Sequence, residues 1–348
     1  MPPPSPVTVY TFRDDHAAHR APGHPERPAR LAAIRERLDA DPRLGGLLHL
    51  RGQEAPREAL ERVHAPDYLD LLDAFCANGG GLLDVDTYAT PASARVAREA
   101  CGDLLAVVDA VATGRARNGF ALVRPPGHHA RPAAAMGFCL LAHVAVAARH
   151  AQAAHGVGRV LVVDFDVHHG NGTQEAFYTD PSVLTFSSHQ ADIFPGSGAL
   201  GETGEGAGEG FCANAPLPPG TADAPVLELY RRVLLPLADR FRPELVLVSA
   251  GYDAHRLDPI GGLALSIGGL TALMHVALEI ADRHAGGRLV ASLEGGYNTD
   301  VLGHAVAASL RALCDPAAPA YDPFGPTRLP PVPLDGLIAD LRALHRLG

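Results

Sequence analysis

The residues best suited to bind a metal ion lie in one short run, Asp-Phe-Asp-Val-His, which begins at Asp164. Alternate residues of an extended strand project to the same face, so we expect Asp164, Asp166 and His168 to project together. Carboxylates at the end of a buried strand are costly unless they are paired or bind a metal. Asp253, which follows another apolar run, completes an Asp/His/Asp set with Asp166 and His168. Three protein ligands leave a position open for water, which is typical of a catalytic metal site. In the alternative interpretation, these residues cap turns and helices.

Histidine and tyrosine side chains elsewhere in the chain are suited to move protons. His128 and His129 follow Pro-Pro-Gly, which restricts the backbone, and histidine titrates near neutral pH. Beside a metal site, we interpret the pair as proton-transfer groups rather than as ordinary loop histidines. Tyr297 follows Gly-Gly, and its hydroxyl can donate to an oxyanion that develops in a reaction. His169 points away from the ligand face in strand geometry, so we expect it to be structural.

Short apolar runs that alternate with amphipathic stretches predict the elements that position these residues. The expected strands are Phe120–Arg124, Arg159–Asp164, Ser182–Ser187, Glu244–Ser249 and Arg288–Leu293. The expected helices are Ala92–Thr113, Gly137–His155, Ala222–Arg240, Gly268–His284, Thr299–Leu313 and Leu334–Arg346. Such alternation predicts a mostly parallel sheet with helices on both faces. Functional groups in this class of fold lie at the carboxyl ends of the strands, where all the residues above are found.

Composition and charge exclude several classes of function. The chain has 348 residues, 47% apolar and 20% charged, which suits a folded α/β protein. A net charge of −10 argues against direct nucleic-acid binding. The sequence contains no apolar run long enough to span a membrane and no CxxC pair. Residues 196–201 match GxGxxG but precede a Gly/Glu loop rather than a helix, which argues against a dinucleotide site. Because the N-terminus lacks a secretory signal pattern, we expect a cytoplasmic protein.

The order and spacing of these motifs over residues 7–312 resemble those of the zinc-dependent histone deacetylase superfamily. Within it, the chain is most similar to class II-like bacterial histone deacetylase-like amidohydrolases and acetylpolyamine amidohydrolases. The matching stretches are GHPERP at 23–28, RPPGHHA at 124–130, GFC at 137–139, DFDVHHGNGTQ at 164–174, FPGSG at 194–198, AGYDAH at 250–255, DPIGG at 258–262 and LEGGYN at 293–298. The resemblance implies an α/β, three-layer arginase–deacetylase fold with an eight-stranded parallel sheet flanked by helices. It implies a single catalytic domain over residues 1–316, and we expect the Pro-rich tail, 317–348, to carry a short helix packed on that domain.

The resemblance also implies roles for individual residues. The zinc ligands would be Asp166, His168 and Asp253. The residues implied in catalysis are His128, His129, Tyr297, Asp164 and Asn171. Of these, His129 would be the proton shuttle with Asn171 behind it, and Tyr297 would be the oxyanion donor. The tunnel for the substrate would be lined by Phe138 and Phe194, with the Gly137 carbonyl nearby. A monovalent-cation site, expected to hold structural K⁺, would use Asp164, Asp166, His168, Ser187 and Ser188.

The implied reaction removes acetyl or longer acyl groups from the lysine ε-amine of proteins or peptides by attack of metal-activated water. We expect one Zn²⁺ per chain, and the donor set also accepts Fe²⁺ or Co²⁺. The loops Phe12–Gly23 and Val85–Pro91 are expected to form the rim and to carry His16 and Asp86. Ile260 stands where polyamine-selective members carry a glutamate, so we expect acyl-lysine peptides to be preferred over acetylated polyamines. The sequence leaves the oligomeric state open, and we expect no membrane partner.

Three other functions compete with this interpretation. The related dimanganese ureohydrolases need two further carboxylates, and Gly170 and His255 stand in those places. A non-catalytic acyl-lysine binder is disfavoured because Tyr297 and all three ligands are present. Deacetylation of polyamines or of another small acylated amine stays open as the alternative function.

Overall fold

One sheet of eight parallel strands runs through the computed structural model, which describes residues 7–348. The strand order is β2-β1-β5-β10-β9-β6-β7-β8. The strands are β1 (Val7–Phe12), β2 (Leu48–Leu50), β5 (Ala116–Leu122), β6 (Val160–Asp164), β7 (Val183–Gln190), β8 (Cys212–Leu217), β9 (Leu245–Ala250) and β10 (Leu289–Leu293). A short antiparallel pair, β3 (Gly81–Leu82) and β4 (Tyr88–Ala89), lies outside the sheet. The expected eight-stranded parallel sheet is confirmed.

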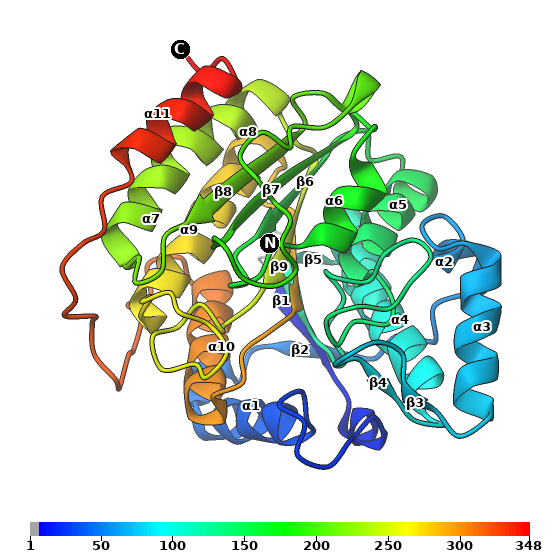
Figure 1. Ribbon diagram of the computed structural model, residues 1–348. Helices are drawn as coiled ribbons and strands as arrows, with labels where there is room; N and C mark the ends of the chain where they lie inside the picture. Colours follow the sequence, from blue (N-terminus) through cyan, green and yellow to red (C-terminus); the bar gives the residue numbers. More distant parts are fainter. Residues whose placement is uncertain (1–6) are drawn as a thin grey trace, which may run out of the picture.

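Helices cover both faces of this sheet (Figure 1). One layer contains α1 (Ala29–Ala40), α7 (Asp223–Leu229), α8 (Leu235–Phe241), α9 (Ile267–His284), α10 (Thr299–Cys314) and α11 (Asp335–Leu344). The other contains α2 (Arg57–Leu60), α3 (Pro66–Ala77), α4 (Ser93–Ala112), α5 (His143–His155) and α6 (Asn171–Phe177). Short 3₁₀ turns occur at Asp14–Ala18, Pro42–Leu44 and Gly206–Gly208. The three layers are those of the arginase–deacetylase fold.

The central strands are apolar on both sides because each face meets a helical layer. Along β6, Leu161 and Val163 belong to the core beneath the α9 and α10 layer, whereas Val160 and Val162 belong to the core beneath α4 and α5. Alternate strand residues point to opposite faces, so a strand buried on both sides reads as one continuous apolar run. This is why these strands could be recognised from the sequence.

Two of the expected helices differ from the structure. The helix expected from Gly137 begins only at His143, because Gly137 and Phe138 have φ values of 54° and 69° and form a left-handed turn. The helix expected over Ala222–Arg240 is divided by a π-helical turn at Tyr230–Leu234, which separates α7 from α8. The spacing of apolar residues continues through the widened turn with little change. Periodicity alone therefore predicts one continuous helix.

The C-terminal segment ends in α11, which packs against the π-helical turn and β8. Ile338 and Leu341 of α11 are buried in the core of that layer. Within residues 7–348, no helix combines the length and the apolarity needed to cross a bilayer.

Candidate active site and metal centre

Five neighbouring strands carry the chemistry that the sequence placed at strand ends. β5, β10, β9, β6 and β7 lie side by side in this order, and all run in the same direction. The loops that follow them therefore meet at one edge of the sheet, as expected for a site in a parallel α/β fold. The side chains described below all come from these loops or from segments packed against them.

A buried donor set forms where the loops after β6 and β9 meet. One ligand atom each of Asp166, His168 and Asp253 lies within 4.8 Å of the other two. His168 Nδ1 is 3.1 Å from Asp166 Oδ1 and 3.5 Å from Asp253 Oδ2. Asp253 Oδ2 is buried and has no hydrogen-bond partner among the described residues. A buried carboxylate oxygen without a partner is costly, so this donor set fits a metal ion.

The charges around the donor set also favour a cation. Burial raises the pKa of Asp253 to about 7, and the nearby Asp166 carboxylate adds to this rise. Burial lowers the pKa of His168, but the nearby Asp166 and Asp253 carboxylates raise it to about 10. The two carboxylates thus stabilise positive charge between them, which a divalent metal would supply.

The side chains gather for a different reason from the one the sequence predicts. β6 ends at Asp164, so Asp166 and His168 do not belong to the strand. Instead, Asp164 Oδ1 accepts a hydrogen bond from Asp166 N at 3.0 Å, and Asp166 Oδ1 accepts one from His168 N at 2.9 Å. These successive side-chain turns keep every second side chain on the same side, as a strand would.

His128 and His129 lie beside the donor set with separate partners. His128 Nδ1 is 2.9 Å from Asp164 Oδ2, and His129 Nδ1 is 2.8 Å from Asn171 Oδ1. Burial opposes protonation of His128, but Asp164 and Asp166 hold its pKa well above the ordinary value. Burial and the neighbouring His128 and His168 imidazoles hold the pKa of His129 well below it. Two histidines with pKa values driven apart can divide the acid and base roles.

Glu294 fixes the backbone of the histidine pair, a function that the sequence analysis missed. Its Oε2 accepts hydrogen bonds from Gly127 N at 2.7 Å and His128 N at 3.1 Å. Its Oε1 accepts one from the Ser249 hydroxyl at 3.2 Å. Burial raises the pKa of Glu294 to about 7. The sequence did contain a signal for this role, because Glu294 directly follows the apolar run of β10. A carboxylate buried at that position needs hydrogen-bond partners.

The loop that carries Tyr297 is held from two sides. Asp258 Oδ2 accepts hydrogen bonds from Tyr297 N at 2.6 Å and Asn298 N at 3.0 Å. Arg30 donates to the carbonyl oxygens of Glu294 and Gly296, and its guanidinium lies 5.0 Å from the centroid of the Tyr297 ring. Burial raises the pKa of the Tyr297 hydroxyl well above its ordinary value, so the phenol stays protonated and able to donate.

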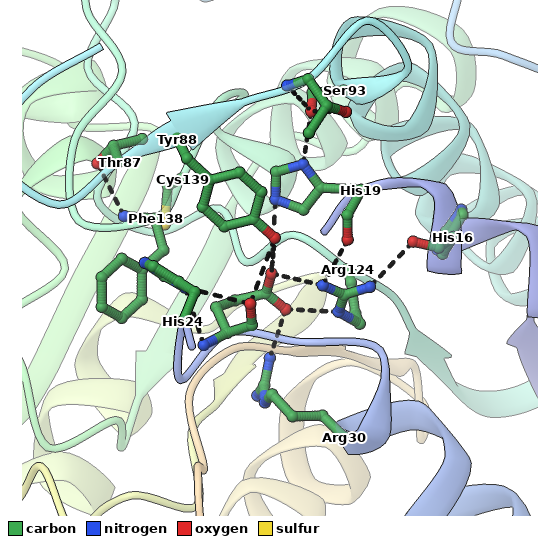
Figure 2. Close-up of polar contacts among 12 residues, drawn as sticks. His16, His19, His24, Arg30, Thr87, Tyr88, Ser93, Arg124, Phe138 and Cys139 are labelled. Carbon is green, nitrogen blue, oxygen red and sulfur yellow. Dashed lines mark hydrogen bonds and ion pairs between the residues drawn. The ribbon is translucent and has the colours of Figure 1, made fainter. Parts of the chain in front are cut away.

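Arg30 belongs to a buried polar network around the carboxylate of Glu26. Figure 2 shows Arg30, Arg124, His19 and Tyr88 pointing toward this centre. Arg124 donates from both Nε and a terminal nitrogen to Glu26, at 2.6 and 2.7 Å. Burial raises the pKa of Glu26, but Arg124 and His19 hold it well below its ordinary value, so this buried carboxyl stays ionised. The network joins the N-terminal loop to the tyrosine loop.

Two phenylalanine rings pack against the histidine pair and the tyrosine. Phe194 packs edge-on against His129, with ring centroids 5.0 Å apart, and Phe138 lies edge-on to Tyr297 at 5.8 Å. A Cβ at Gly137 would lie 2.4 Å from the His129 ring, so only glycine fits there. These partly exposed rings form walls suited to an aliphatic chain.

The two loops expected at the rim differ in how they fold. Asp86 is half-buried, its carbonyl accepts from His24 Nε2 at 3.0 Å, and Thr87 Oγ1 accepts from Phe138 N, so this loop adjoins the aromatic wall. His16 was expected on the rim, but its side chain is fully buried, and burial lowers its pKa to about 3. Its carbonyl instead accepts a hydrogen bond from Arg124 at 2.9 Å. The polar composition of that loop gave no indication that it folds inward.

Ile260 lies in the turn that Asp258 also organises. Its backbone N–H donates to Asp258 Oδ1 at 3.1 Å, while Asp258 Oδ2 holds Tyr297. The Ile260 side chain is partly exposed. One carboxylate therefore sets the position of both the apolar turn residue and the tyrosine.

The remaining candidate positions lie behind and beside the donor set. Ser187 pairs in register with Asp164, and its hydroxyl lies 2.9 Å from His189 Nδ1. Ser188 Oγ is 2.8 Å from the Tyr230 hydroxyl. His169 is buried, with Nδ1 and Nε2 bonded to Ser197 and Gln174 at 2.8 and 3.0 Å, a structural arrangement.

Similarity to known proteins agrees with this geometry. A family model for the histone deacetylase domain matches residues 24–313. The histone deacetylase-like amidohydrolase of Pseudomonas aeruginosa is 42% identical over 279 residues, 80% of this chain and 73% of that protein. The crystal structure of the HDA15 HD domain superposes with a TM-score of 0.87 at 36% identity, covering 98% of this chain and 94% of that one. The chain belongs to the histone deacetylase family.

Another relative is named for a different substrate. The human polyamine deacetylase HDAC10 is 42% identical over 318 residues, which is 86% of this chain and 46% of that protein. Deacetylase activity is therefore supported for this histone deacetylase family member. Its relatives include both histone deacetylases and a polyamine deacetylase, so the family match alone does not identify the acylated amine that is the substrate.

Proposed function

We propose that the protein is a zinc-dependent deacylase that hydrolyses the ε-amide of acetyl-lysine, or of longer acyl-lysines, in proteins or peptides. The observation that carries the proposal is the buried Asp166, His168 and Asp253 donor set, with its orphaned carboxylate oxygen, beside two histidines and a tyrosine. When bound there, the metal supplies Lewis-acid polarisation of the acyl carbonyl and lowers the pKa of a water molecule. The donors fit Zn²⁺, and their oxygen and nitrogen chemistry also fits Fe²⁺ or Co²⁺.

The residues of the chain divide the remaining chemistry among them. His129, whose pKa is held low, accepts the proton of the attacking water. The protonated Tyr297 hydroxyl donates a hydrogen bond to the oxyanion as it develops. A histidine of the pair returns a proton to the leaving nitrogen, so one water and one amide yield a carboxylate and a primary amine. Phe138 and Phe194 exclude water from the aliphatic stem of the substrate.

Asn171 and Asp164 orient the two imidazoles in this proposal. Each accepts a hydrogen bond from an Nδ1–H, which leaves Nε2 of the ring free to face the substrate. The Asp164, Ser187 and Ser188 region also forms the candidate site for K⁺, whose positive charge would lie behind the histidine pair.

Acetylated polyamines are the alternative substrate class, supported by the similarity to a polyamine deacetylase. Ile260 favours acyl-lysine instead, since an apolar side chain offers no partner to a second ammonium group. The test is acetate release from acetyl-lysine peptides, longer acyl-lysine peptides and acetylspermidine by the zinc-loaded protein. We expect the lysine peptides to give the highest kcat/KM and Asp253→Ala to abolish turnover of all three. Turnover retained in Asp253→Ala would reject the metal mechanism, whereas a preference for acetylspermidine would reject only the substrate assignment.

A further inference from the structure

A second cluster of metal-binding side chains lies away from the site above. Asp109 of α4 and His150 and His155 of α5 each place one ligand atom within 4.8 Å of the other two. The Nε2 atoms of His150 and His155 lie 2.7 and 2.6 Å from the same Asp109 Oδ1. α4 leads into β5 and α5 into β6, so the cluster lies at the amino edge of the sheet, opposite the active site.

The geometry points to a solvent-facing site for a transition metal ion of the Zn²⁺ type, formed by Asp109, His150 and His155. Two imidazole nitrogens and one carboxylate oxygen are a donor set that suits Zn²⁺, Ni²⁺ and Cu²⁺ and is unsuited to Mg²⁺ or Ca²⁺. The Asp109 side chain is 40% exposed and the two histidines 17% and 18%, so an ion has access and a fourth position faces water.

The donors are close to the arrangement that a metal needs. Tetrahedral zinc with bonds of about 2.0 Å separates its ligand atoms by roughly 3.3 Å, so the two Asp109–histidine distances must lengthen by only about 0.6–0.7 Å. Each Nε2 would lose its proton and bind the metal instead of donating a hydrogen bond to Asp109. Burial raises the pKa of Asp109, but the two neighbouring histidines hold it below its ordinary value.

The end of α5 is fixed, which limits the cost of ordering the ligands. Arg149 of α5 pairs with Asp180 at 2.5 Å, and Gln152 donates to Ser182 at 2.8 Å. Gly156 follows His155 with a φ of 66° and closes the helix by donating to the Gln152 carbonyl. A metal at this position would cross-link the end of α5 to α4.

The chain contains a matched pair that lacks these properties. His284 Nε2 lies 2.8 Å from Asp239 Oδ1, but only one imidazole is present, and Arg283 is 3.6 Å from the same oxygen. A guanidinium so close repels a divalent cation. The pair is therefore a control for histidine–aspartate contacts that bind no metal.

The test is equilibrium dialysis of the zinc-loaded protein against increasing Zn²⁺, with bound metal counted by elemental analysis. We expect a second, weaker equivalent per chain in the wild type and in His284→Ala. His155→Ala should weaken this second equivalent by at least about 10-fold while keeping the first and the deacylase activity. Asp109→Asn keeps the side-chain shape and should weaken the second equivalent to a similar extent. It therefore tests the site independently of any effect of His155→Ala on the helix.

A second readout does not depend on activity. Added Zn²⁺ should raise the Tm of Asp253→Ala, whose catalytic donor set is incomplete, and should leave that of Asp253→Ala/His155→Ala unchanged, because only a folded site stabilises by mass action. Mg²⁺ should have no effect on either. A wild type that saturates at one equivalent up to roughly 100 μM free Zn²⁺, or a second equivalent that persists in His155→Ala and Asp109→Asn, would overturn the proposal.

Discussion

Tyr297 and Ile260 show how one carboxylate can position two residues with different tasks. Asp258 holds the backbone of both, so the tyrosine hydroxyl and the apolar turn residue share a fixed frame. Changes to either side chain leave these backbone hydrogen bonds in place. Each residue can therefore be tested through its side chain alone.

Removing the Tyr297 hydroxyl should affect the chemical step more than binding. In Tyr297→Phe the ring still packs against Phe138, but the donor to the oxyanion is lost. We expect kcat to fall about 10²–10³-fold with little change in KM, since the hydroxyl acts on charge that exists only in the transition state. Steady-state kinetics on an acetyl-lysine peptide measure this. A variant within a few-fold of the wild type would make Tyr297 a turn residue only.

Introducing a charge at Ile260 should shift substrate preference. A glutamate there can pair with a secondary ammonium of acetylspermidine, a charge-assisted contact worth about 1.5–3 kcal/mol. We expect Ile260→Glu to move the kcat/KM ratio of acetylspermidine to acetyl-lysine peptide by about 10- to 100-fold toward the polyamine. Ile260→Gln, polar and without charge, is the control and should move it much less. Equal shifts in both variants would assign the effect to shape rather than charge.

At the scale of elements, sequence pattern predicts what is periodic and misses what is folded inward. The apolar runs of β6, β9 and β10 and the apolar stripe of α4 appear as expected, because each faces a layer of the core. The Gly137–Phe138 turn and the buried loop around His16 do not, since their conformation depends on tertiary partners. Spacing relative to strand ends singled out Asp166, His168 and Asp253, which the structure brings together, although the turns that align them are not a strand. Nothing in the sequence near Glu26 indicated that Arg124 lies beneath it.

The Glu26 network is where an element-scale change should cost most stability. Glu26 is fully buried with Arg124 and Arg30, so Glu26→Ala leaves two guanidinium groups without a buried counter-charge. Removing one partner of such a pair typically lowers the free energy of unfolding by about 3–5 kcal/mol. Urea denaturation measures the loss. The control is Glu58→Ala, whose carboxylate pairs with Arg62 at 2.6 Å but is 83% exposed, and which should cost at most about 1 kcal/mol. Similar losses in both variants would contradict a structural role for the network.

The whole molecule carries a net charge of −10, which bears on how substrates arrive. Acetylated polyamines are cationic, and so are acyl-lysine peptides whose other residues are basic; a negative surface speeds the encounter of such substrates with the site through long-range attraction. Salt shortens the reach of this field, since the Debye length falls from about 10 Å at 0.1 M to about 3 Å at 1 M.

We therefore expect kcat/KM for a lysine- and arginine-rich acetylated peptide to fall several-fold between these salt concentrations. An uncharged acetyl-lysine amide of the same acyl group should change little, because it gains nothing from the field. The rate constant kcat describes only the steps after the substrate is bound. It should therefore be nearly independent of salt for both substrates. Parallel kinetics with the two substrates over a salt series make the comparison, and the same salt dependence for both would place the effect on the enzyme itself rather than on its attraction for cations.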